Sequence, residues 1–370
     1  MRVLIIHNEA RYFAGAEKVL GYFLEGWQGT GHEITVAAVP GARVLAAIPP
    51  LIPRIWIPEK QRFSTLKLFR QAAAVLRGRR QFAFDVVHGW TARDWELAAL
   101  VGWLSRRPSV GTLHDHPCSR FISRSRQGLM RAAARWGLKR TICVSEAVRR
   151  ACVEAGYDAT ALAVVHNGLP DRVAARTPGG AGPWRLGFLG AFSERKGLNT
   201  LFAILADLSG LAREPWEIHI AGEAQDEAGR SMIGQIHGRF GQAPWWSRVH
   251  WHGWVTEPAR FLDTLDLLLV PSSEFDPFPT VLLEAAQSGV AVLAADVGGI
   301  REIVVDGETG VLFDPMEPAE AAKRLARLLD DRKKCNRMAS EAVLRVRGQF
   351  SVGKMVAHYI KVYSTLAPHV

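Results

Sequence analysis

The 370-residue sequence lacks several features that would assign it to particular classes of protein. Its longest N-terminal apolar run, Val3–Ile6, is too short for a secretory signal or a membrane span. Its four cysteines form no C-x-x-C pair and no metal-ligand spacing, so we expect reduced thiols in a cytosolic protein. The absence of a G-x-x-x-x-G-K-[ST] loop argues against P-loop chemistry.

Acidic residues are scarce in the first half of the chain. Residues 1–177 hold 26 Lys and Arg against 13 Asp and Glu, whereas residues 178–370 hold 20 against 23, and the net charge is +10. A basic half favours an anionic partner such as phospholipid, a lipid-linked phosphate or nucleic acid. The alternative is that the basic residues form a generic surface with no specific anionic partner. Because no helix-turn-helix, zinc or RNP signature accompanies the charge, we expect no nucleic-acid partner.

The N-terminal half alternates between short apolar runs and amphipathic segments, which indicates βαβ units and a parallel sheet. A helix is predicted over 14–28, and Ser145 is predicted to cap a helix over 146–155. The predicted strands are 1–7, 33–39, 85–88, 109–114, 141–144 and 163–166.

The alternation restarts after Thr177–Pro183, a Gly- and Pro-rich segment that we interpret as a linker. We therefore expect two Rossmann-like α/β domains, over 1–177 and 178–350, with ligands bound in a cleft outside the carboxyl ends of their strands. A last helix, 351–370, is expected to cross back to the first domain. The strands predicted in the second half are 185–189, 217–221, 249–252, 267–270, 290–294 and 310–313.

The stretch Pro271–Gly310 carries the clearest chemistry. A buried strand leads into a loop with Asp276, and a helix is predicted to begin near Pro279, with Glu284 one to two turns later. The free N–H groups of residues 280–282 would hold an anion at the helix N-terminus. The alternative is that Asp276 only caps the helix and Glu284 is solvated.

This stretch closely resembles the E-x7-E region of retaining family-4 glycosyltransferases, which have the GT-B fold. Asp276 and Glu284 keep the family's spacing, with Asp in the first acidic position, and Glu274 is a conceivable substitute for it. The resemblance covers about Val3–Leu366. It implies that the first acid lies by the transferred sugar and that Glu284 binds ribose hydroxyls.

Other positions match the family in order. The stretch 186–197 resembles the donor-diphosphate loop, Thr112–Asp115 contains the family's cleft histidine His114, and 13–17 resembles its Gly-Gly-Ala-Glu loop, where Gly15 and Ala16 would contact phosphate and acceptor. The resemblance implies that the donor is bound by Gly190, Arg195, Lys196, Val255, Phe278, Pro279, Thr280, Val281 and Glu284, and that Asp276, His114 and Glu274 are the catalytic candidates.

The function implied is retaining, hexosyltransferase-type transfer from a nucleoside-diphosphate sugar to an acceptor hydroxyl in cell-surface polysaccharide or glycolipid synthesis. No cofactor is expected, since the sugar nucleotide is a substrate. No metal is expected either, because D-x-D is missing after the strands and His114-Asp115-His116 is weak as a ligand set. A sugar-nucleotide epimerase and a non-catalytic GT-B-fold subunit stay open as alternatives.

Arg120–Arg140 interleaves basic residues with apolar ones and reads as an interfacial amphipathic region. It favours peripheral contact with the cytosolic face of an anionic inner membrane and with a lipid-linked acceptor. The alternative is an ordinary surface helix whose apolar face is buried. The apolar residues concerned are Phe121, Ile122, Leu129, Met130, Trp136 and Leu138.

Overall fold

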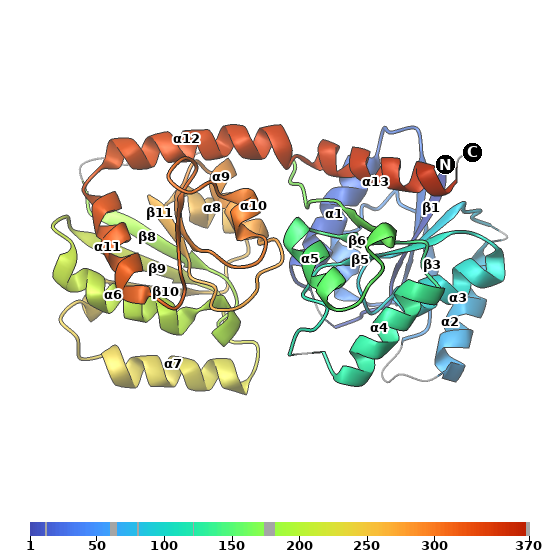
Figure 1. The fold of residues 1–370 in the computed structure, drawn as a ribbon, viewed down its shortest axis with the longest axis horizontal. Coiled ribbons are helices and arrows are strands. Elements are labelled where there is room, and N and C mark those ends of the chain that lie inside the picture. Colours follow the sequence, from blue (N-terminus) through green and yellow to red (C-terminus); the bar gives the residue numbers. More distant parts are fainter. Residues whose placement is uncertain (12, 60–64, 80, 121, 174–181, 368–370) are drawn as a thin grey trace. The chain divides into compact units, whose positions relative to one another are not determined.

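The computed structural model describes residues 1–11, 13–59, 65–79, 81–120, 122–173 and 182–367. The chain forms two compact units, which are described separately: Met1–Pro170 with Ser351–Val370, and Asp171–Phe350 (Figure 1). Residues 177–181 of the linker predicted from the sequence lie outside the described ranges. Within the part of the chain that is described, no helix is long and apolar enough to cross a bilayer.

The first unit is built on a seven-stranded parallel sheet in the order β3-β2-β1-β4-β5-β6-β7. Its central strands are buried on both faces, which explains why their sequences are continuous apolar runs such as VLII. The strands are β1 Arg2–His7, β2 Glu33–Ala38, β3 Arg54–Trp56, β4 Val86–Gly89, β5 Ser109–Leu113, β6 Arg140–Cys143 and β7 Leu162–Val164.

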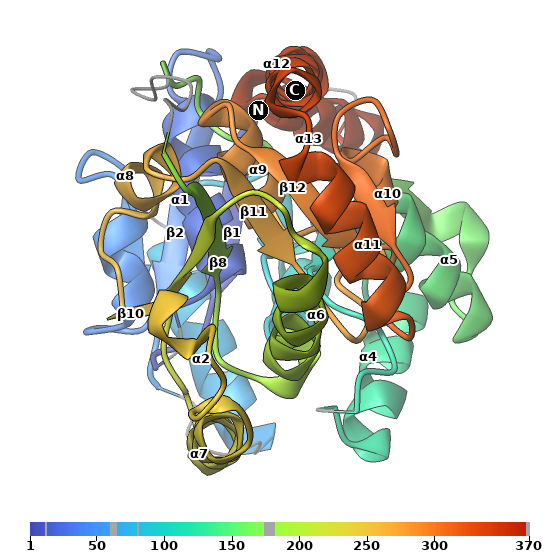
Figure 2. The ribbon, with the colours of Figure 1, turned by 90° about the vertical axis from the view of Figure 1, so that its left-hand side faces the viewer.

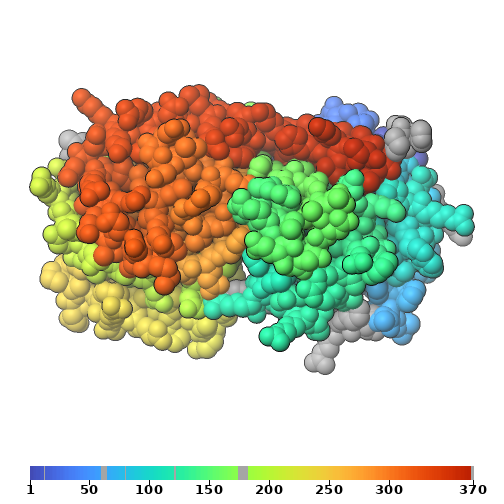
Figure 3. Space-filling view, in the orientation of Figure 1, coloured from blue at the N-terminus to red at the C-terminus, as the bar shows by residue number. Residues whose placement is uncertain are grey.

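Helices cover this sheet, and the C-terminal helix α13 is one of them. It packs along α1, where the ring centroids of Phe23 and Tyr359 lie 5.0 Å apart. The green surface of α4 and α5 is exposed in the space-filling view (Figure 3). The helices are α1 Gly15–Trp27, α2 Thr65–Gly78, α3 Trp95–Ser105, α4 Arg124–Trp136, α5 Glu146–Glu154 and α13 Val352–Leu366, with 3₁₀ turns η1 Arg43–Ala47 and η2 Ala159–Ala161.

The second unit has a six-stranded parallel sheet in the order β10-β9-β8-β11-β12-β13. Apolar side chains of α6 and α11, which pack side by side, form its main core with one face of the sheet (Figure 2). The strands are β8 Trp184–Leu189, β9 Trp216–Ala221, β10 Val249–Gly253, β11 Leu267–Val270, β12 Ala291–Ala295 and β13 Val311–Phe313. The helices are α6 Leu198–Leu211, α7 Glu227–Phe240, α8 Pro258–Asp263, α9 Thr280–Gln287, α10 Ile300–Ile303, α11 Pro318–Leu329 and α12 Arg332–Gln349, with 3₁₀ turns η3 Glu194–Lys196 and η4 Trp246–Arg248.

The predicted α/β class with two parallel-sheet units is confirmed, and each predicted strand is present within about two residues. The Ser145 cap is confirmed as well, since its hydroxyl accepts from the Val148 N–H at 3.1 Å. The elements β3, α2, α7, α8 and α10 were not predicted from the sequence. Three of them, β3, α8 and α10, are too short to show a period. The helix α2 has apolar residues at helical spacing and could have been recognised.

Candidate functional site

The loops after β8, β9 and β10 meet at the carboxyl edge of the second sheet. The Gly190 N–H donates to the Ala221 carbonyl at 3.1 Å, and the Gly222 N–H donates to the Gly253 carbonyl at 2.8 Å. Gly222 has φ +141°, and a Cβ there would lie 1.9 Å from the Gly190 carbonyl oxygen. Only glycine fits this contact, which fixes Gly190 against the neighbouring loop.

A second glycine joins the β8–α6 loop to the end of β11. Gly197 has φ +72°, and a Cβ there would lie 1.6 Å from the Pro271 carbonyl oxygen. Ser273 completes the junction, since its N–H donates to the Arg195 carbonyl and its hydroxyl to the Glu194 carbonyl. Both predicted phosphate-binding cations, Arg195 and Lys196, therefore lie beside the acidic loop.

Lys196 and Asp276 form an ion pair at this junction. The Lys196 Nζ donates to the Asp276 Oδ2 at 2.6 Å, and the Ser272 hydroxyl donates to the same oxygen at 3.1 Å. Burial disfavours ionisation of Asp276, but the charges of Lys196 and Arg195 and these hydrogen bonds outweigh it, so its pKa lies below the ordinary value. Asp276 is thus a buried carboxylate, and its charge is balanced by Lys196.

The Gly298-Gly299 turn closes over the backbone of Asp276. The Gly299 N–H donates to the Asp276 carbonyl at 2.8 Å. Gly298 has φ +57°, and a Cβ there would lie 2.1 Å from the same carbonyl oxygen. The Gly298-Gly299 turn is therefore in direct contact with Asp276.

The start of α9 differs in one respect from its prediction. Pro279 is the N-cap residue, and Thr280 begins the helix. The Leu282 N–H, which was expected to be free for an anion, donates to the Pro279 carbonyl at 3.2 Å. This correction follows from a tight first turn, and it leaves the Thr280 and Val281 N–H groups for an anion at this end.

The remaining predicted residues of this unit differ in exposure. Phe278 is buried, and its ring meets the Phe350 ring edge-on at 5.4 Å, so its side chain anchors the start of α9. Glu274, Val255 and Glu284 are half-buried. Glu274 is accordingly more open to solvent than Asp276.

In the first unit, Trp90 connects the predicted phosphate loop to the predicted histidine. Its indole N–H donates to the Ala16 carbonyl at 2.8 Å, and its own carbonyl lies 3.1 Å from the His114 Nε2. Burial lowers the pKa of His114 to about 4, so the ring is neutral at pH 7. Since the proton on Nε2 is donated to Trp90, Nδ1 is left as an acceptor. Gly15 and Ala16 form the first turn of α1.

Glu17 holds that first turn in place. Its carboxylate accepts from the Ala14 N–H at 2.8 Å and lies 3.2 Å from the buried His7 Nε2. Burial acts against both charges, but their mutual attraction prevails: the pKa of Glu17 is lowered and that of His7 is raised. Trp90 and His7 were not predicted as site residues from the sequence. The sequence feature that could have indicated them is their position at strand ends, with His7 at the end of β1 and Trp90 directly after β4.

Potential metal ligands gather at a place that the sequence did not point to, in a chain for which no metal was expected. Among the described residues, the group that brings three ligand atoms within 4.8 Å of one another is Glu217, His219 and His250, and it does not include His114-Asp115-His116.

Comparisons with known proteins identify the family to which each half of the chain is similar. Residues 176–345 match the family described as glycosyl transferases group 1, and residues 13–172 match glycosyltransferase family 4. A phosphatidyl-myo-inositol mannosyltransferase of Mycolicibacterium smegmatis is 30% identical over 295 residues, which are 77% of this chain and 72% of the relative. A glycogen synthase of Mycobacterium tuberculosis is 28% identical over 299 residues, 77% of this chain and 69% of the relative.

Solved structures match across both units. Anabaena HepE in complex with UDP-glucose has a TM-score of 0.85 at 22% identity, covering 99% of this chain and 100% of that one. Sucrose-phosphate synthase of Thermosynechococcus elongatus has a TM-score of 0.79 at 18% identity and covers all of both chains. The fold is therefore GT-B, and the chain belongs to the group 1 glycosyl transferases of glycosyltransferase family 4.

Proposed function

We propose that this protein transfers a sugar, with retention of anomeric configuration, from a nucleoside-diphosphate sugar to an acceptor hydroxyl. The observation that carries the proposal is the Lys196–Asp276 pair at the carboxyl edge of the second sheet, beside the N-terminus of α9. Open parallel sheets bind ligands at this edge. Since HepE was solved with UDP-glucose, a UDP-sugar is the first donor to test.

In this proposal, positive groups stabilise the charge that develops on the departing diphosphate. Lys196 turns from Asp276 towards the phosphate, and Arg195 and the free N–H groups of α9 assist it. Asp276 or Glu274 then faces the transferred sugar, and Glu284 binds the ribose. The acceptor attacks on the face from which the diphosphate leaves, and the diphosphate takes the acceptor's proton.

His114 contributes an uncharged acceptor in the first unit. Its Nδ1 would receive a hydrogen bond from a donor-sugar hydroxyl, and the first turn of α1 at Gly15 and Ala16 would contact phosphate or acceptor. Because the charge is stabilised by side chains and backbone, no metal is needed for the transfer itself. A cell-surface polysaccharide or glycolipid is the proposed class of product.

The test is release of nucleoside diphosphate from UDP-, GDP-, ADP- and dTDP-sugars, with and without a lipid extract as acceptor, in EDTA. We expect one donor to be consumed only when acceptor is present. Proton NMR of the early product should show the donor's anomeric configuration. Product of the opposite configuration, or donor consumption that needs a divalent ion, would contradict the proposed mechanism.

A lipid-linked acceptor is supported by one exposed feature of α4. Met130 and Leu138 of the predicted interfacial region are buried, as expected of an ordinary surface helix, but Trp136 is 81% exposed with the Arg135 guanidinium 5.2 Å from its ring centroid. Phe121 lies outside the described ranges. An exposed tryptophan among arginines suits the interface of an anionic membrane.

Sedimentation with vesicles tests this contact. We expect recovery with anionic but not neutral vesicles, and less recovery after Trp136→Ala. Trp103→Ala is the matched control, because Trp103 is 76% exposed on α3 of the same unit. Equal recovery with both kinds of vesicle would count against the membrane contact.

A further inference from the structure

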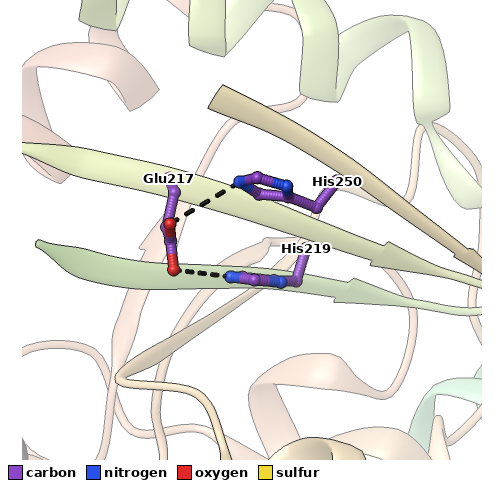
Figure 4. Close-up of side chains that lie close together, drawn as sticks. All are labelled: Glu217, His219 and His250. Carbon is purple, nitrogen blue, oxygen red and sulfur yellow. Dashed lines mark hydrogen bonds and ion pairs between the residues drawn. The ribbon is translucent and has the colours of Figure 1, made fainter. Parts of the chain in front are cut away.

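Three potential metal ligands lie side by side where β9 meets the edge strand β10. Glu217 and His219 are two residues apart on β9, and the register of the parallel pair sets His250 beside His219. Side chains two residues apart on a strand point to the same face. Figure 4 shows the Glu217 carboxylate beside the two stacked imidazoles, with one oxygen towards each ring.

The distances between the ligand atoms are close to those found between the ligands of a bound zinc ion. The His219 Nε2 lies 2.9 Å from the Glu217 Oε1, and the His250 Nε2 lies 3.6 Å from the Glu217 Oε2. Ligand atoms of a tetrahedral zinc ion, each about 2.0–2.1 Å from the metal, are about 3.4 Å apart. Small side-chain rotations would therefore place an ion between the three residues without moving either strand.

His252 supplies the partner that a metal-bound His219 requires. Its Nε2 lies 2.9 Å from the His219 Nδ1. When the His219 Nε2 binds a metal, the ring proton sits on Nδ1 and donates to His252, which fixes the ring's orientation.

Arg185 would compete with a metal ion for the Glu217 carboxylate. Its Nη1 lies 3.4 Å from the Glu217 Oε1, so the guanidinium partly neutralises this carboxylate when no metal is bound. Its side chain is 43% exposed and can turn into solvent. The alternative to a metal site is thus a hydrogen-bonded network of Glu217, Arg185 and the histidines.

We propose that Glu217, His219 and His250 bind one divalent transition-metal ion of the zinc type, with His252 orienting His219. Two imidazoles and a carboxylate suit zinc and exclude magnesium, which prefers oxygen ligands. A water would complete the shell, since Glu217 and His250 are partly exposed. The ion would tie the edge strand β10 to β9.

This site is separate from the proposed donor site. Glu217 and His219 lie in the first four residues of β9, whereas the donor loops follow its last residue, Ala221. The metal and the sugar transfer can therefore be tested independently. Nucleotide is not needed for metal binding, and the proposed transfer needs no metal.

The experiment uses the full chain without an affinity tag, stripped with a chelator. Zinc is titrated in competition with a chromophoric chelator, cobalt absorption reports the ligand geometry, and thermal unfolding is followed with zinc and with magnesium. The variants are His250→Gln at the site, Arg185→Gln at the competitor, and His358→Gln as control, since His358 is exposed on α13 of the other unit.

We expect one zinc per chain, a higher unfolding temperature with zinc but not magnesium, and at least tenfold weaker binding in His250→Gln. His358→Gln should bind as the parent does, and Arg185→Gln several-fold more tightly. The unfolding temperature of stripped His250→Gln shows that the variant is folded. Absence of stoichiometric zinc, or equal affinity in His250→Gln and the parent, would overturn the proposal.

Discussion

The ammonium group of Lys196 lies 2.6 Å from the buried Oδ2 of Asp276, although the two residues are 80 positions apart in the sequence. Their side chains are 22% and 3% exposed, so this is a largely desolvated ion pair. Both residues were predicted to act on the donor, one on the diphosphate and one by the sugar. In the ligand-free chain each is the other's counter-ion.

Removal of Lys196 should therefore affect stability as well as binding. Lys196→Ala leaves a buried carboxylate without its main partner, and we expect a loss of about 3 kcal/mol in the free energy of unfolding. Adding Asp276→Asn should recover most of that loss, while diphosphate affinity stays low. Urea unfolding and calorimetric titration measure the two effects. If the double variant is no more stable than Lys196→Ala, the ion pair is not what stabilises this junction.

The Gly298 turn should tolerate no side chain. Gly298→Ala combines a left-handed backbone with a Cβ 2.1 Å from the Asp276 carbonyl oxygen. Gly307→Ala is the matched control, because Gly307 also has positive φ but has open space around its Cβ position. We expect about 1–2 kcal/mol of destabilisation for Gly307→Ala and clearly more for Gly298→Ala. Equal losses in urea unfolding would show that the contact with Asp276 is unimportant.

His114 should make folding sensitive to acid. Its pKa is lowered to about 4, so between about pH 6.5 and 4 the unfolded chain binds a proton that the folded chain does not. Stability should fall as the pH drops through this window, by at most about 1.4 kcal/mol per pH unit, and be unaffected by this group above it. His114→Asn should reduce the slope by the share that His114 contributes, whereas the buried His88, whose pKa is lowered to about 3, keeps its own share. An unchanged slope would mean that His114 is not held neutral.

A buried network should hold α13 to the first sheet. The Tyr363 hydroxyl lies 2.7 Å from the His88 Nδ1, and the Thr112 hydroxyl lies 2.8 Å from the His88 Nε2 and 3.2 Å from the Tyr359 hydroxyl. Tyr363→Phe leaves a buried ring nitrogen unpaired, which costs about 1–3 kcal/mol.

Tyr359→Phe is the comparison for this network, because Thr112 keeps its bond to His88. We expect a loss of about 1 kcal/mol or less from this variant in urea unfolding. A larger loss for Tyr359→Phe than for Tyr363→Phe would contradict the assigned network.

The architecture could be predicted because strands buried on both faces are continuous apolar runs, as in Leu267–Val270. The helix α7 was not predicted, because three glycines are interspersed among its apolar residues Met232, Ile233, Ile236 and Phe240 and glycine has a low helix propensity. Tertiary packing, rather than amphipathic pattern, stabilises such a helix.

The sequence predicted which residues belong to the candidate site, but it did not predict which of them contact one another. The motif around Asp276 predicted a carboxylate beside a helix N-terminus. It did not predict that Lys196 would be its partner, because that depends on how two loops pack. Likewise, the sequence shows E-x-H at Glu217–His219 and H-x-H at His250–His252. These side chains can be placed together on one face of the sheet only when the register of β9 and β10 is known.

The measurement that tests the central claim most directly is calorimetric titration of UDP, GDP, ADP, dTDP and CMP into the parent protein, Glu284→Ala, Lys196→Ala and Lys333→Ala. Lys333 is the control, an exposed lysine on α12 of the same unit. We predict that one nucleoside diphosphate binds selectively, that Glu284→Ala and Lys196→Ala weaken it at least tenfold, and that Lys333→Ala does not. Binding of none of the nucleotides, or equal binding by all four proteins, would contradict the assigned donor site.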